Sequence, residues 1–311
     1  MNGLQLSRDY FFESALPRLK NDFSDKLENL AAGLVGNGSE CFGYDDEISR
    51  DHDWGVDFFI WVLDADRTLI EPLLEWKRNL FEKCPPKHPR TRSEYGAGIG
   101  VMTVGDFYAS LIGAPSGPQN IQEWRRVPEE NLAMSVNGGI FIDGPGEFTR
   151  VRNYILNYYP EDLRLKKIAA RCMALAQTGQ YNLDRTAKRR DWVTLRTVLS
   201  QFADSAIAMV FLLNRVFRPY YKWAFKRMTE LPVLGGEVGA RLNKIALTGG
   251  LDVYSLSEIG RLISEICAIF VDELRRQGVS GSDDWFLTSH GEEAQSRIRD
   301  EFLKKLPTQY E

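Results

Sequence analysis

Residues 34–54, LVGNGSECFGYDDEISRDHDW, lead from a small turn at Gly38-Ser39 to a pair of acids, Asp51 and Asp53. The second acid opens an apolar run that predicts a strand over 53–63. Side chains alternate between the faces of a strand, so both acids are expected to point to one spot at its start, with His52 facing away. Two carboxylates at one point suit Mg²⁺, which takes one or two carboxylates together with substrate phosphates. The Gly38-Ser39 turn is expected to offer backbone N–H groups and a hydroxyl to those phosphates, which is equipment for moving a nucleotidyl group.

The pattern around this segment predicts a mixed α/β half. Further strands are expected from short apolar runs at 30–35, 99–104 and 139–142. Helices are expected at 7–23, where Ser7 is a plausible N-cap, at 67–83 after Asp66, and at 105–112. Residues 115–128 are rich in turn formers and are expected to form a loop.

The C-terminal half has a different character. Helical patterns follow one another almost without interruption, at 147–158, 161–178, 184–200, 202–228, 255–277 and 292–305, with a glycine-spotted break at 232–250. The predicted fold class is therefore α+β: a small mixed sheet flanked by helices in a domain over 1–146, followed by an all-helical bundle over 147–311. Two domains are also what a chain of 311 residues favours.

Composition indicates a soluble globular chain. Apolar residues make up 43% and charged residues 26%, and the net charge of −4 argues against a surface that coats nucleic acid. The four cysteines are widely separated and no signal peptide is apparent, so a reduced, cytoplasmic protein without structural zinc is expected. The most apolar helical stretch, at 203–217, is interrupted by polar residues and is too short to span a bilayer, so no membrane partner is expected.

The segment resembles the signature of the nucleotidyltransferase superfamily in three features: the Gly38-Ser39 turn, the interval of eleven residues between Ser39 and Asp51, and the two acids. Ile99–Val104 and Gln122-Glu123-Trp124 are similar to segments of the aminoglycoside adenylyltransferases within it. The runs 38–47 and 49–53, with 181–183 and 214–223, also look like a bacterial family of unassigned function with a nucleotidyltransferase-like N-terminal half. The resemblance implies a nucleotidyltransferase fold, Mg²⁺, and ATP or another NTP as co-substrate.

The chain departs from the superfamily pattern at a third acid, which active members usually place on a neighbouring strand. The strand expected at 99–104 contains no carboxylate. Glu94 precedes it, Asp106 follows it, and Asp143 ends the next strand; the sequence does not choose among the three, and Asp143 is equally a turn former. The acids of the intervening loop, Asp45, Asp46 and Glu47, form either a solvated surface or a support for the metals.

Two C-terminal stretches carry cations near aromatic residues. Residues 181–190 include Arg185 and Arg189 at a probable helix start, which form either a solvated basic face or a set of cations facing a triphosphate. Residues 214–223 include Tyr220 and Lys222; aromatic residues at a kink are often core, but the resemblance implies a lysine on phosphate and an aromatic ring near adenine. Arg50, beside the acid pair, is a further candidate for a phosphate contact.

The leading hypothesis is a Mg²⁺-dependent enzyme that transfers a nucleotidyl group, AMP from ATP, to a hydroxyl of a small-molecule or protein acceptor. Asp51 and Asp53 would act as metal ligands and catalytic residues. Gly38, Ser39, Arg50, Arg185, Arg189, Tyr220 and Lys222 would bind the nucleotide. The alternative is a catalytically silent nucleotide sensor or interaction protein of the same fold, and a nucleic-acid acceptor is disfavoured by the acidic composition.

Overall fold

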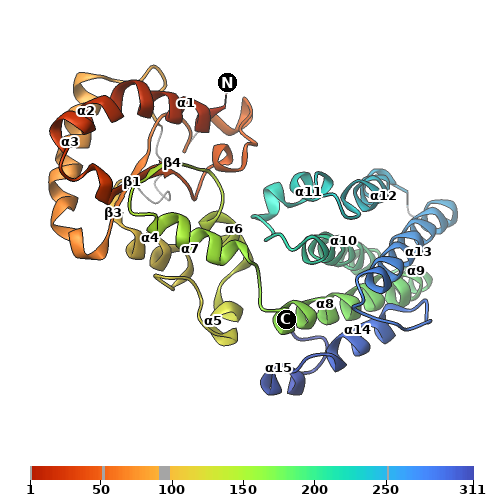
Figure 1. Cartoon of the computed structure of the whole chain (residues 1–311). Coiled ribbons are helices and arrows are strands. Elements are labelled where there is room, and N and C mark those ends of the chain that lie inside the picture. Colours follow the sequence, from red (N-terminus) through yellow and green to blue (C-terminus); the bar gives the residue numbers. More distant parts are fainter. Residues whose placement is uncertain (1, 51–52, 91–98, 251) are drawn as a thin grey trace. The chain divides into compact units, whose positions relative to one another are not determined.

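A computed structural model of the chain describes residues 2–50, 53–90, 99–250 and 252–311. The chain forms two compact units, Met1–Tyr158 and Tyr159–Glu311 (Figure 1). The sequence had placed the boundary after residue 146. Helix α7 (Glu147–Leu156) instead belongs to the first unit, because its Phe148 packs 4.1 Å from the ring of Trp61 and its backbone carbonyl accepts a hydrogen bond from Tyr108.

The first unit is built on a four-stranded mixed sheet, as expected for an α+β fold. Its strands are β1 (Leu30–Leu34), β2 (Phe59–Val62), β3 (Val101–Thr103) and β4 (Gly139–Asp143), in the order β3-β2-β1-β4. Strand β1 is antiparallel to both β2 and β4, and β2 is parallel to β3. The apolar runs at 30–35, 99–104 and 139–142 thus form strands close to the predicted bounds.

Helices cover both faces of this sheet. On one face, Ala32 and Ile60 pack against a continuous helical segment, α1 (Gly3–Tyr10), a π-helical turn (Phe11–Ala15) and α2 (Leu16–Asp22), and against α3 (Ile70–Lys83). On the other face, the rings of Phe59 and Trp61 contact Phe107 of α4 (Val104–Ile112) edge to face. The remaining helices of this unit are α5 (Ile121–Arg126) and α6 (Glu129–Ser135), with 3₁₀ turns at Leu27–Asn29, Ser39–Phe42, Ile48–Arg50 and Asp64–Leu69.

The prediction of a strand over 53–63 is wrong for the first half of this range. Strand β2 begins only at Phe59, and the chain before it is bent: Asp53 has a φ of 50° and Gly55 a φ of 121°, both far from extended geometry. The loop expected over 115–128 contains α5, because the side chain of Asn120 caps its first turn by accepting a hydrogen bond from Glu123 N–H.

The described residues of the second unit form helices and their connections. Helix α8 (Glu161–Leu175) runs into a π-helical segment (Ala176–Asn182) and α9 (Leu183–Arg189); the others are α10 (Trp192–Asn214), α11 (Tyr221–Thr229), α12 (Gly235–Leu247), α13 (Val253–Arg276), α14 (Leu287–Ser296) and α15 (Glu301–Lys305). The break expected over 232–250 is wrong, since α12 occupies most of it. Its glycines allow close packing: a Cβ on Gly239 would lie 2.7 Å from Thr229 Cγ2.

Helix α10 was expected as two helices that meet near residue 201, but it is a single helix of 23 residues. Its length and apolar composition would suffice to cross a membrane, yet 61% of the apolar window is buried inside the protein. This burial is consistent with the core helix of a soluble protein.

Candidate functional site

One end of the sheet collects the segments that the sequence singled out. Because Gly33 pairs with Phe59, Leu34 with Gly139, and Ile60 with Val101, this end contains the chain after β1 and the chain before β2, β3 and β4. The turn that follows β1 therefore lies at the same edge as the segment from Asp53 to Phe58. The β-pairing thus brings the turn and Asp53 to the same end of the sheet.

The turn after β1 is held by an amide from a distant part of the chain. The Asn137 side chain accepts a hydrogen bond from Gly36 N–H and donates one to Gly36 O, both at 2.8 Å. The next residue, Gly138, donates its N–H to Cys41 O at 2.8 Å. The sequence analysis did not single out Asn137, because nothing local indicates that an asparagine a hundred residues away would bridge this turn.

Behind the turn lies a buried ion pair that the sequence analysis also missed. Arg90 pairs with Glu40, and both side chains are almost inaccessible to solvent, at 7% and 0%. Burial raises the pKa of the Glu40 carboxyl, and the positive charge of Arg90 opposes that shift. Arg90 is held beside the segment that precedes β2, because Val56 N–H donates a hydrogen bond to His88 O at 2.8 Å and Val56 forms an isolated β-bridge with Pro89.

The acids of the loop between turn and strand have structural partners. Asp45 Oδ2 accepts hydrogen bonds from Gly3 N–H at 2.7 Å and from Trp54 Nε1 at 2.9 Å, so it ties the loop to the start of α1. Asp46 accepts from the backbone N–H groups of Ile48 and Ser49. The guanidinium of Arg50 lies 4.8 Å from the ring centroid of Trp54, which places this cation on an aromatic surface of the loop.

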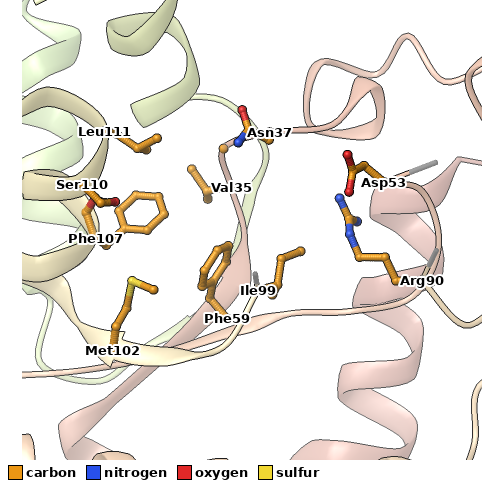
Figure 2. A pocket seen from close by; sticks show the side chains of 11 residues that line it. Val35, Asn37, Asp53, Phe59, Arg90, Ile99, Met102, Phe107, Ser110 and Leu111 are labelled. Carbon is orange, nitrogen blue, oxygen red and sulfur yellow. The ribbon is translucent and has the colours of Figure 1, made fainter. Parts of the chain in front are cut away.

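A hollow of about 500 Å³, counting the part open to solvent, lies at this end of the sheet. Figure 2 shows two contrasting sides of it: Asp53 and Arg90 carry its charged groups on one side, and mostly apolar side chains occupy the other. Asn37 borders the hollow at the turn. The apolar part is lined by Val35, Phe59, Ile99, Met102, Phe107 and Leu111, with the hydroxyl-bearing Ser110 among them.

The predicted site residues around the hollow are placed as follows. Asp53 lines the hollow, and the turn borders it through Gly36 and Asn37, whereas Gly38 and Ser39 follow as half-buried residues of the same turn. Asp51 and His52 lie outside the described residues. The argument that two acids share a strand face does not hold for Asp53, because this residue is not in a strand.

Two of the three candidates for a further carboxylate lie at the other end of the sheet. Asp143 is the last residue of β4 and pairs with Ala31 near the start of β1, and its Oδ2 accepts hydrogen bonds from the N–H and hydroxyl of Thr149, which tie it to the first turn of α7. Asp106 follows β3 and forms an ion pair with Arg67 at 2.6 Å, which lowers the pKa of its carboxyl. Glu94, which precedes β3 in the sequence, lies outside the described residues.

No group of three or more His, Cys, Asp or Glu side chains within the described ranges is arranged to hold a metal ion. The one described carboxylate that lines the hollow is Asp53. A single protein carboxylate is compatible with Mg²⁺, which commonly completes its shell with water and substrate phosphates. The donor set around the hollow therefore fits a Mg²⁺–nucleotide complex better than a metal held by protein ligands alone.

The candidate residues of the second unit form two separate groups. The Arg185 guanidinium lies 3.8 Å from the ring centroid of Tyr181, and Lys222 Nζ lies 5.2 Å from that of Trp223. Arg189 precedes the first turn of α10, whereas Arg218, close before Lys222, pairs with Asp204 in the middle of that helix. The rise from Asp191 to Asp204 is about 20 Å, so these cations do not form one cluster.

A protein-family model described as "Domain of unknown function (DUF4037)" matches residues 124–224, from α5 in the first unit to α11 in the second. The match includes Arg185, Arg189, Tyr220 and Lys222, and it leaves out the turn and Asp53. No curated protein and no solved structure matches the chain.

Proposed function

We propose that the protein is a Mg²⁺-dependent nucleotidyltransferase that moves a nucleotidyl group, AMP from ATP, to a hydroxyl of a small-molecule or protein acceptor. The observation that supports this proposal is the hollow at the sheet end, where the turn after β1, Asp53 and Arg90 border one space. The enclosed part of the hollow, about 50 Å³, is smaller than typical small-molecule sites of about 300–1,000 Å³, so most of a bound nucleotide would lie in the part that is open to solvent.

The two sides of the hollow suit the two parts of a nucleotide. The half-buried Met102 and Leu111 offer an apolar surface against which a nucleobase would pack, and the rings of Phe59 and Phe107 beside them are buried. Asn37 and Arg90 offer hydrogen-bond donors on the polar side, which suits phosphate oxygens. The base would occupy the apolar part, and the phosphates would extend toward Asp53.

Asp53, together with Asp51 two residues earlier in the chain, would hold Mg²⁺ on the phosphates. When bound, Mg²⁺ would neutralise the charge that develops on the transferred phosphoryl group and on pyrophosphate. The protein residues would position the nucleotide: the Gly36–Ser39 turn against the phosphates and Arg90 beside them. The acceptor hydroxyl would approach from the open side of the hollow.

The test is binding and turnover in matched variants. Isothermal titration calorimetry with ATP and Mg²⁺ measures binding, and pyrophosphate release in the presence of a panel of hydroxyl acceptors measures transfer. Asp53→Asn and Asp51→Asn are expected to lower turnover by a factor of about 10³ or more, because each removes a metal ligand. Asp106→Asn is the matched control, since Asp106 lies at the other end of the sheet and pairs with Arg67. Equal turnover in Asp53→Asn and in the wild type would refute the proposal.

A second function, nucleotide binding without transfer, is favoured by one observation. Within the described residues, the hollow has a single lining carboxylate, and both Asp106 and Asp143 are committed to structural contacts away from it. A sensor or interaction protein of the same fold would bind ATP and Mg²⁺ in the calorimeter but release no pyrophosphate with any acceptor. ATP binding that survives Asp53→Asn, with no pyrophosphate release by the wild type, would identify this function.

A further inference from the structure

The second unit exposes a cluster of large apolar side chains at the point where three helices begin or end. Val193 is 80% exposed, Leu247 76%, Val253 87% and Tyr254 85%, and Trp192 lies beside them at 38%. We call these five residues the apolar end. Single exposed apolar residues are ordinary in soluble proteins, but several together mark an interaction surface.

A hydrogen bond within the unit links the segments that carry the apolar end. Trp192 and Val193 begin α10, and Arg196, one turn further, donates a hydrogen bond from Nη2 to Gly249 O. Gly249 lies in the short connection between the end of α12, which contains Leu247, and the start of α13, which contains Val253 and Tyr254. This hydrogen bond therefore brings the first turn of α10 next to both segments.

Cations lie next to the part of the apolar end that is formed by α10 and α12. Residues 184–196 contain five Lys or Arg side chains against two acids, although the whole chain has a net charge of −4. Lys188, Arg189, Arg190 and Arg196 are exposed next to the start of α10, and Lys244 is exposed one turn before Leu247. The acids at the two helix starts, Asp191 and Asp252, are engaged as N-caps that accept from Thr194 and Ser255 N–H.

We propose that the apolar end is a docking surface for membranes that contain acidic phospholipids. The charge complementarity is direct, because the fringe of Lys and Arg faces an anionic headgroup layer while Val, Leu, Trp and Tyr enter the interface. Aliphatic side chains favour a lipid over a nucleic acid, since Val193, Leu247 and Val253 have no ring on which a base can stack. The sequence analysis expected no membrane partner because the most apolar helical stretch was judged too short to span a bilayer, whereas docking on a membrane surface requires no spanning helix.

The experiment is sedimentation of the full-length protein with large vesicles. One set contains equal parts of phosphatidylserine and phosphatidylcholine, and the other contains phosphatidylcholine alone. Binding to the acidic vesicles is expected to exceed binding to the neutral ones by at least about tenfold, and to weaken when salt rises from about 0.1 M to 0.5 M. Absence of binding to the acidic vesicles would overturn the proposal.

Paired variants locate the surface. Val193→Ser with Val253→Ser is expected to weaken binding to acidic vesicles by about tenfold, and Arg189→Glu with Arg190→Glu by more. The matched controls are Ile48→Ser, an apolar residue of the first unit that is 83% exposed, and Lys304→Glu with Lys305→Glu at the exposed end of α15. The controls are expected to bind like the wild type, and circular dichroism melting is expected to show every variant folded, because none of these side chains is buried.

Two other occupants are distinguished by the same variants. If the apolar end binds RNA, labelled single-stranded RNA will shift in a gel with the wild type and not with Arg189→Glu with Arg190→Glu. If it binds a second copy of this chain, analytical ultracentrifugation will show a dimer that Val193→Ser with Val253→Ser dissociates. Either result without vesicle binding, or equal vesicle binding by the variants and their controls, would overturn the proposal.

Discussion

Replacing Arg90 by Met tests the buried ion pair on which the candidate site rests. The substitution keeps much of the side-chain volume but removes the positive charge beside Glu40, whose side chain is fully buried. A buried ion pair that loses one partner costs about 3–5 kcal/mol, because the remaining charge is left in a medium that solvates it poorly. We expect the free energy of unfolding of Arg90→Met to fall by this amount near neutral pH.

The loss is expected to depend on pH. Burial already raises the pKa of Glu40 despite Arg90, and without Arg90 this pKa will rise further. A folded-state pKa above the unfolded value of about 4.3 means that folding takes up a proton, so the stability of the variant falls as pH rises, by up to about 1.4 kcal/mol per pH unit. The variant is therefore expected to be closer to the wild type at about pH 5 than at about pH 8.

Urea unfolding followed by circular dichroism at the two pH values measures both effects. The double variant Arg90→Met with Glu40→Gln is expected to recover most of the loss and to lose its pH dependence, because no charge remains buried. The control is Arg150→Met, which removes an exposed partner of Glu147 and is expected to cost no more than about 1 kcal/mol. A loss in Arg90→Met that is no larger than in the control, or that is identical at both pH values, would refute the reasoning.

Two further predictions concern the packing of the same fold. Gly138→Ala is expected to destabilise the protein by at least about 2 kcal/mol, because the added Cβ would lie 2.0 Å from Leu34 O at a φ of 63°. Gly236→Ala in α12 is the control and is expected to be neutral or slightly stabilising, because no atom lies within 4 Å of the added Cβ. A thermal melt that ranks the two variants in the opposite order would contradict this account. Of the four thiols, only that of Cys84 is partly exposed, so a thiol-reactive dye is expected to label one cysteine in the native protein and four in urea. Burial raises the pKa of the other three, Cys41, Cys172 and Cys267, the last to about 12. Rapid native labelling of more than one thiol would show that this burial is incorrect.

The parts of the fold that the sequence predicted well are those decided by local pattern. The apolar runs that became β1, β3 and β4 are bounded by turn residues, and the amphipathic period of α13 is continuous over six turns, so neighbouring residues specify these elements. The wrong predictions have tertiary causes. Residues 53–58 lead into the apolar run of β2, but Asp53 and Gly55 adopt positive φ, and Asp57 forms an ion pair with the buried Lys77, whose Nζ lies 2.6 Å from it.

In the candidate site, too, the sequence predicted the local features and not the contacts between distant residues. The sequence by itself determined a Gly-Ser turn and a closely spaced pair of acids with a strand on each side, because these features lie within about twenty residues and depend on local spacing. Only the tertiary structure decided which distant groups join them: Asn137 on the turn, Arg90 at the hollow, and Asp106 and Asp143 at the opposite end of the sheet. The physical reason is that strand register, set by burial of whole faces of the sheet, fixes which ends of the strands meet, and no local pattern carries that information.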